Sequence, residues 1–174
     1  QKKKMSKSSV AVLKNIINDL TSKNQNKENI FKISSHVIAE LKNLNEDNYF
    51  TYLIHRYRYE IYPQKKILDD YPPYLQIEPS SICNYRCVFC YQTDNYFNKR
   101  TTGHMGKMSL KLFKKIIDQA EKNIHFISLA SRGEPLINDD IEKMLEYTSG
   151  KFLNLKINTN ASQLNENMSH AILS

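Results

Sequence analysis

The sequence predicts an α/β fold, in which a partial parallel sheet of about three βα units follows a small helical N-terminal region. The first observation is that apolar residues in the first 62 positions recur only at the three- and four-residue spacing of helices. The second is that, from residue 71 onward, short strand-like segments alternate with amphipathic stretches, which is typical of a parallel sheet. We therefore divide the chain into residues 1–70, a helical region with a connector, and residues 71–174, an incomplete α/β domain.

Bulk composition favours a soluble globular protein, because 40% of the 174 residues are hydrophobic and 25% are charged. The net charge of +7 indicates a solvated, lysine-rich surface, and only residues 56–59 combine basic and aromatic side chains, so we expect no nucleic-acid partner. No apolar run approaches the roughly 18 residues that cross a bilayer. The basic start lacks the apolar core of a secretory signal. We therefore expect no membrane partner and a cytoplasmic location, where the three cysteines are free thiols.

Three helices are predicted in the N-terminal region, each from a stripe of apolar residues along one face. They span residues 8–22, 29–44 and 47–62. Pro63 is expected to end the third helix, and Pro72-Pro73 favours extended backbone in the connector. His36 and His55 stand alone on these helices, and we interpret them as packing or surface residues rather than ligands.

The remaining elements follow in alternation. The predicted strands cover residues 74–78, 126–130 and 152–157. The predicted helices cover residues 109–122, 139–149, and a last segment that begins near 162–165 and runs to residue 174. Ser109 is the expected N-cap of the first of these helices. Each strand is followed by a polar motif, and the carboxyl ends of parallel strands share one edge of a sheet, so the three motifs should lie together.

The motif after the first strand contains all three cysteines of the chain, Cys83, Cys87 and Cys90, spaced C-x3-C-x2-C. Clustered thiolates favour iron–sulfur clusters or zinc. A closed site usually takes four protein ligands, so three cysteines leave one coordination position open or filled by another group. A structural zinc site completed by His104 and a non-catalytic iron–sulfur module are the alternatives to a reactive centre.

These cysteines, with Phe89 before the last of them, resemble the signature of the radical S-adenosylmethionine (radical SAM) superfamily. The resemblance implies that Cys83, Cys87 and Cys90 bind three irons of a [4Fe–4S] cluster and that SAM chelates the fourth. It implies an enzyme that cleaves SAM reductively to a 5′-deoxyadenosyl radical, which abstracts hydrogen from a substrate. Phe89 would lie near the adenine.

Two further motifs carry the resemblance. Gly133-Glu134-Pro135 resembles the family's Gly-Gly-Glu-Pro after the second strand, with Arg132 in place of the first glycine. Glu134 would then meet the SAM ammonium group, and a plain turn glutamate is the alternative. Asn158-Thr159-Asn160-Ala161 resembles the family's Thr-Asn-Gly after the third strand, with Ala161 in place of the glycine. Asn158 and Asn160 would face SAM, and a helix-capping turn is the alternative. We assign no catalytic residue beyond the cluster ligands.

Residues 75–78 and 90–94 resemble the subgroup that carries a C-terminal SPASM region. This resemblance implies a peptide or a sugar-related small molecule as substrate, and an electron donor such as flavodoxin or ferredoxin. The family barrel has six βα units, whereas this sequence has three predicted strands. We therefore expect a partial radical SAM barrel, truncated after the third strand, that is poorly stable and inactive alone.

Overall fold

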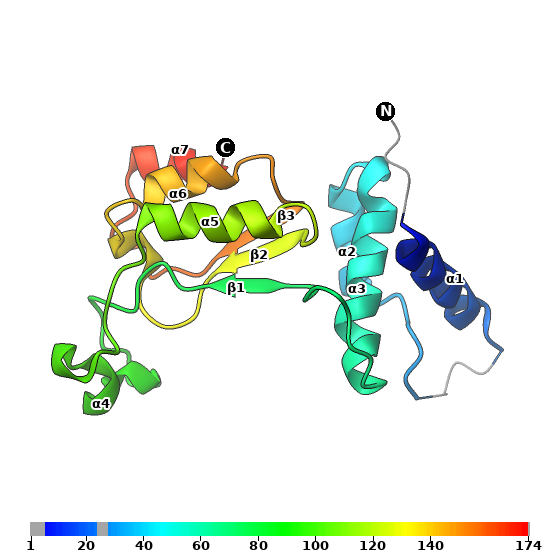
Figure 1. Cartoon of the computed structure of the whole chain (residues 1–174), viewed down its shortest axis with the longest axis horizontal. Coiled ribbons are helices and arrows are strands. Elements are labelled where there is room, and N and C mark those ends of the chain that lie inside the picture. Colours follow the sequence, from blue (N-terminus) through cyan, green and yellow to red (C-terminus); the bar gives the residue numbers. More distant parts are fainter. Residues whose placement is uncertain (1–5, 24–27, 174) are drawn as a thin grey trace. The chain divides into compact units, whose positions relative to one another are not determined.

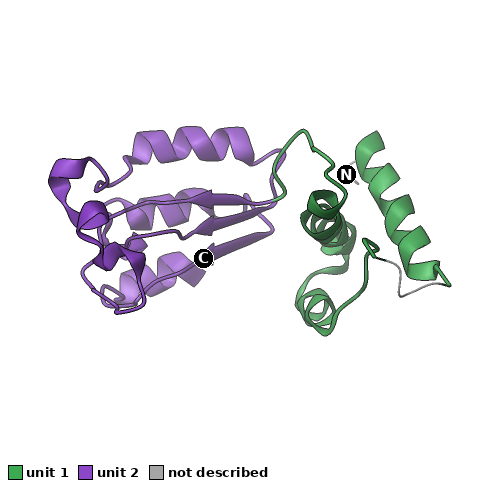
Figure 2. Ribbon diagram, turned by 90° about the horizontal axis from the view of Figure 1, so that it is seen from below, with its two compact units in different colours: residues 1–73 green, residues 74–174 purple. Residues whose placement is uncertain are grey.

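The computed structural model describes residues 6–23 and 28–173, and it divides into two compact units, Gln1–Pro73 and Tyr74–Ser174 (Figure 2). None of the helices within the described residues is long and apolar enough to cross a membrane.

The first unit contains three α-helices. They are α1 (Lys7–Thr21), α2 (Ser35–Asn43) and α3 (Tyr49–Gln64), with the short 3-10 helix η1 (Glu46–Asn48) before α3. A core of aliphatic and aromatic side chains holds α1 against α3 and consists of Val12, Ile16, Phe31, Ile54, Tyr57 and Ile61. This small core explains the apolar stripes of the sequence.

Two predicted boundaries in this unit were wrong. The second helix begins at Ser35 rather than at residue 29, because the Ser34 hydroxyl accepts the Val37 N–H as an N-cap. The residues before it are not helical, and the fully buried Phe31 donates its backbone N–H to the Asp19 carboxylate. Pro63 does not end α3, which continues to Gln64, because a proline in the last turn removes only its own N–H donor.

The second unit is a three-stranded parallel sheet in the order β1-β2-β3, which confirms the predicted α/β class. Its strands are β1 (Leu75–Ile77), β2 (Phe126–Leu129) and β3 (Asn154–Ile157), all shorter than predicted. Its longer helices are α5 (Leu110–Ala120), α6 (Ile141–Thr148) and α7 (Glu166–Leu173). Four short helical turns were not predicted, namely η2 (Tyr91–Thr93), α4 (Asn95–Asn98), η3 (Arg100–Thr102) and η4 (Pro135–Ile137).

All three longer helices cover one face of the sheet (Figure 1). Ile77, Ile127 and Leu129 point to that face and pack against buried residues of α5, α6 and α7. The residues between them point to the opposite face of the sheet. There, one register row across the three strands consists of Gln76, Ser128 and Lys156. The register also brings the carboxyl ends of the strands together, because the Ala130 N–H reaches the Ile77 carbonyl at 3.2 Å. The loops that follow the strands therefore start from one edge.

Candidate functional site

The cysteine loop follows β1 at this edge. Cys83, Cys87 and Cys90 are free and partly exposed thiols. The Cys90 N–H donates to the Cys87 carbonyl at 2.9 Å, so the last two cysteines flank a tight turn. Phe89 lies on that turn with 89% of its surface exposed. An apolar ring so exposed beside the cysteines is available to contact a ligand.

Buried hydrogen bonds fix the segment that leads into this loop. The Asn138 side chain donates to the Pro79 carbonyl at 2.6 Å and to the Met108 carbonyl at 2.9 Å. The Ser81 N–H donates to the Gly106 carbonyl, and the Ser81 hydroxyl accepts the Gly106 N–H at 2.7 Å. The entry to the loop is therefore held on both sides by groups that have little freedom to move.

Gly133 lies directly against this entry segment. Its φ is +78°, and a Cβ built on it would lie 1.9 Å from the Ser80 carbonyl oxygen. Its N–H donates to Gln92 Oε1 at 2.6 Å, and Gln92 Nε2 donates to the Ser81 carbonyl at 2.7 Å. Gln92 is 4% exposed, so this amide joins the end of the cysteine loop to the loop after β2. No sequence pattern predicted this role of Gln92.

Glu134 is the most connected of the predicted site residues. Its carboxylate, 1% exposed, accepts the Thr159 hydroxyl at 2.5 Å, the Asn160 N–H at 2.7 Å and the Leu136 N–H at 3.0 Å. Its own N–H donates to the Ile82 carbonyl at 2.8 Å. Both carboxylate oxygens thus bind protein donors, so Glu134 ties the loops after β2 and β3 together. Its contact with a SAM ammonium stays a prediction.

Asn160 connects the loop after β3 to the cysteines. Its side-chain nitrogen lies 3.8 Å from the Cys83 sulfur and 3.0 Å from Asn84 Oδ1. Asn158 is exposed, and its backbone N–H donates to the Leu129 carbonyl. Pro135 is buried at the start of η4. The three motifs therefore meet at one edge, where Glu134 and Asn160 link them and Asn158 stays at the surface.

Aromatic residues gather on the loop after the cysteines. The Tyr91 and Tyr96 rings meet Phe97 edge-on, with centroids 5.5 Å and 5.3 Å away. His104 lies 4.8 Å from the Tyr96 ring centroid and so belongs to this cluster. Burial raises the pKa of the Tyr91 phenol above its ordinary value. These contacts are those of packing residues.

The donor set fits an iron–sulfur cluster chemically, because it offers three free thiols on one short loop and no disulfide competes for them. Within residues 6–23 and 28–173, no three His, Cys, Asp or Glu side chains converge closely enough to hold a metal ion. The cysteines therefore supply the right ligands but do not yet surround a common point.

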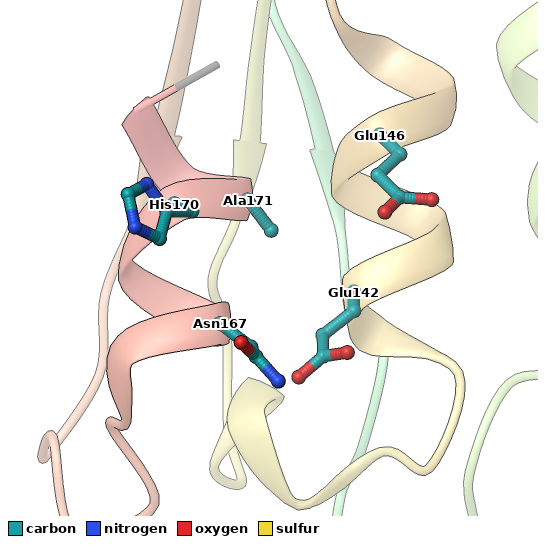
Figure 3. Close-up of a pocket in the computed structure, with 5 residues that line it drawn as sticks. All are labelled: Glu142, Glu146, Asn167, His170 and Ala171. Carbon is teal, nitrogen blue, oxygen red and sulfur yellow. The ribbon is translucent and has the colours of Figure 1, made fainter.

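A groove of about 510 Å³ lies elsewhere, between α6 and α7 (Figure 3). It is lined by Glu142, Glu146, Asn167, His170 and Ala171. None of these residues belongs to a strand-end loop, so the groove is separate from the candidate site.

Comparison with known proteins gives the same assignment for this region. The sequence model of the radical SAM superfamily matches residues 77–172. A tungsten-containing aldehyde ferredoxin oxidoreductase cofactor-modifying protein of Pyrococcus furiosus is 32% identical over 97 residues, which are 55% of this chain and 26% of that protein. The chain thus spans about a quarter of this relative.

Two solved structures are similar to the chain. BtrN in complex with AdoMet and 2-DOIA has a TM-score of 0.51 and 22% identity, over 61% of this chain and 43% of BtrN. Streptococcus suis SuiB bound to precursor peptide SuiA has a TM-score of 0.46 and 22% identity, over 78% of this chain and 32% of SuiB. The first likeness shows a shared fold. Because the family match covers more than half of the chain, from the last residue of β1 through the cysteine loop, β2 and β3, this protein belongs to the radical SAM superfamily.

Proposed function

We propose that residues 74–174 form the cluster-binding part of a radical SAM enzyme. The observation that carries the proposal is the link between the three motifs, since Glu134 and Asn160 fasten the loops after β2 and β3 to the loop that carries the cysteines. A structural zinc loop would not require the other two strand ends to be bound to it.

The residues have distinct roles in this proposal. Cys83, Cys87 and Cys90 hold a [4Fe–4S] cluster, and the site that they leave open is for SAM. Phe89 offers an exposed ring to the adenine, and Gly133 allows the loop after β2 to approach the cysteine loop closely. When bound, the cluster supplies the electron for reductive cleavage of SAM.

We also propose a cytoplasmic enzyme of the SPASM-containing subgroup, acting on a peptide or a sugar-related small molecule. Its electron donor would be an acidic protein such as flavodoxin or ferredoxin. The expected electron donor is supported by three exposed basic residues on or just after the cysteine loop, Arg86, Lys99 and Arg100. They would attract an acidic partner to the cluster.

Anaerobic reconstitution of the chain with iron and sulfide tests the proposal. We expect iron–sulfur absorption, about four irons per chain, and an electron paramagnetic resonance (EPR) signal of the reduced cluster that changes when SAM is added. Tight zinc binding without iron–sulfur absorption would refute the proposal. A cluster whose signal ignores SAM would favour the non-catalytic iron–sulfur module. Cys87→Ser removes the metal site under either hypothesis, so the response to SAM is the discriminating measurement.

A further inference from the structure

We propose that the Asn160 side chain tunes the cluster by donating an N–H hydrogen bond to the sulfur of Cys83, which raises the cluster's reduction potential. This inference rests on the proposed function, because it assumes that Cys83 is a cluster ligand.

The orientation of the Asn160 amide follows from its partners. Its Oδ1 accepts the Ser162 N–H at 2.9 Å, so the opposite end of the amide must be the NH₂ group. That group has two N–H bonds and two acceptors, Asn84 Oδ1 at 3.0 Å and the Cys83 sulfur at 3.8 Å. A flipped amide would set its oxygen against Asn84 Oδ1 and lose the Ser162 bond, so the network itself selects the donor orientation.

The backbone of Asn160 is also held in place, by Glu134. Its backbone N–H donates to Glu134 Oε2 at 2.7 Å, and the Glu134 carboxylate is almost completely buried. A donor held in this way reorganises little when the charge on the neighbouring sulfur changes. The side chain is therefore a fixed dipole directed at the Cys83 sulfur.

Cys83 is distinguished from the other two cysteines by these contacts. Its sulfur also accepts the Tyr85 N–H at 3.4 Å, so it receives two N–H donors. The described residues place no hydrogen-bond donor on the sulfur of Cys87 or Cys90. These two donors would thus act on a bound cluster through Cys83.

Hydrogen bonds to the sulfurs are among the factors that set iron–sulfur potentials. Reduction adds negative charge to the cluster, so a donor stabilises the reduced state more than the oxidised state. Removing one neutral hydrogen bond should lower the ratio of reduced to oxidised cluster by about two- to tenfold at a fixed potential. The upper value equals a shift of about 59 mV toward more negative potential for a one-electron couple.

The experiment is an EPR-monitored redox titration of the reconstituted chain without SAM. Asn160→Leu removes both side-chain N–H donors at similar volume, and Asn160→Asp removes them and adds a negative charge. Ser162→Ala is the matched control, because it breaks the 2.8 Å bond from Asn84 to the Ser162 hydroxyl and so loosens the same contact without touching a sulfur. Asn154→Leu, at the other end of β3, controls for the loss of an exposed amide.

We expect both Asn160 variants to titrate at more negative potential, Asn160→Asp the further of the two, with both controls at the wild-type value. Wild-type potential in Asn160→Leu or Asn160→Asp would overturn the inference. So would an equal shift in Ser162→Ala, because loop position and not the N–H donor would then set the potential. Folded Asn160 variants that take up no cluster would also overturn it, since Asn160 would then be needed for assembly. If the wild-type chain forms no [4Fe–4S] cluster, the proposed function itself fails.

Discussion

Replacing Gly133 with alanine should damage the candidate site more than any other single methyl group. Gly133 has a φ of +78°, and the added Cβ would lie 1.9 Å from the Ser80 carbonyl oxygen and 2.8 Å from Ser81 Cα. Those atoms are backbone, and hydrogen bonds hold the residues on either side of the Ser80 carbonyl. Met108 and Asn138 donate to the Pro79 carbonyl, and the Gly106 N–H donates to the Ser81 hydroxyl. The clash can therefore be relieved only by separating the loop after β2 from the cysteine loop.

The loss of folding free energy in Gly133→Ala has two parts, and alanine variants of two other glycines separate them. A left-handed backbone conformation costs an ordinary residue about 1–2 kcal/mol, and overpacking adds about 1–3 kcal/mol. Gly133→Ala should thus lower the free energy of unfolding by about 2–5 kcal/mol. Gly150 has a φ of +68° but no atom within 4 Å of its Cβ position, so Gly150→Ala carries only the first part. Gly106→Ala carries neither, because its Cβ also meets nothing and its φ is not positive.

Thermal and urea unfolding of the three variants, followed by circular dichroism, measures the difference. A loss of 2 kcal/mol lowers Tm by at least about 8 °C in a domain of roughly 100 residues. The expected order of stability is Gly106→Ala, then Gly150→Ala, then Gly133→Ala. If Gly133→Ala is no less stable than Gly150→Ala, the close approach of the two loops is not a constraint and the reasoning is refuted.

Three further predictions concern the same loops. Glu134→Gln should lower the free energy of unfolding by about 2–3 kcal/mol in urea, because an amide cannot accept all three donors. Glu146→Gln, at an exposed position of α6, should change it by less than about 0.5 kcal/mol, and equal effects would contradict the role of Glu134. Gln92→Leu should speed hydrogen exchange of the Gly133 amide, because it removes the acceptor of that N–H, and an unchanged rate would exclude this link. Ala161→Gly should leave the free energy of unfolding unchanged or raise it by up to about 1 kcal/mol, because the φ of +59° strains alanine but not glycine. A clear loss of stability in urea would contradict that strain.

The sequence was sufficient for those features that depend on local pattern. The strand-like segments formed strands, and Ser109 caps α5 by accepting the Leu112 N–H, as expected. The meeting of the three motifs was also predictable, because parallel strands end at one edge. Glu134 and Asn160 then bond directly across that edge.

Features that depend on distant partners could not be predicted. Gln92 reads as an ordinary loop residue, and its role follows only from Gly133, 41 positions later. The segment before the second helix is not helical, and its Phe31 enters the core of the first unit, a tertiary contact that no apolar stripe encodes.

The two departures from the family motifs are accommodated in different ways. Arg132 replaces the first glycine, and its φ is not positive, so the turn does not need glycine there. Instead the Arg132 guanidinium pairs with Glu78 at 3.2 Å, and its N–H donates to the same carboxylate, which joins the ends of β1 and β2. Ala161 replaces a glycine but keeps the left-handed conformation that glycine favours, so its Cβ adds strain without changing the path of the chain. Both substitutions therefore leave Glu134 and Asn160 able to join the loops after β2 and β3 at the cysteine loop, without the glycines that the chain lacks.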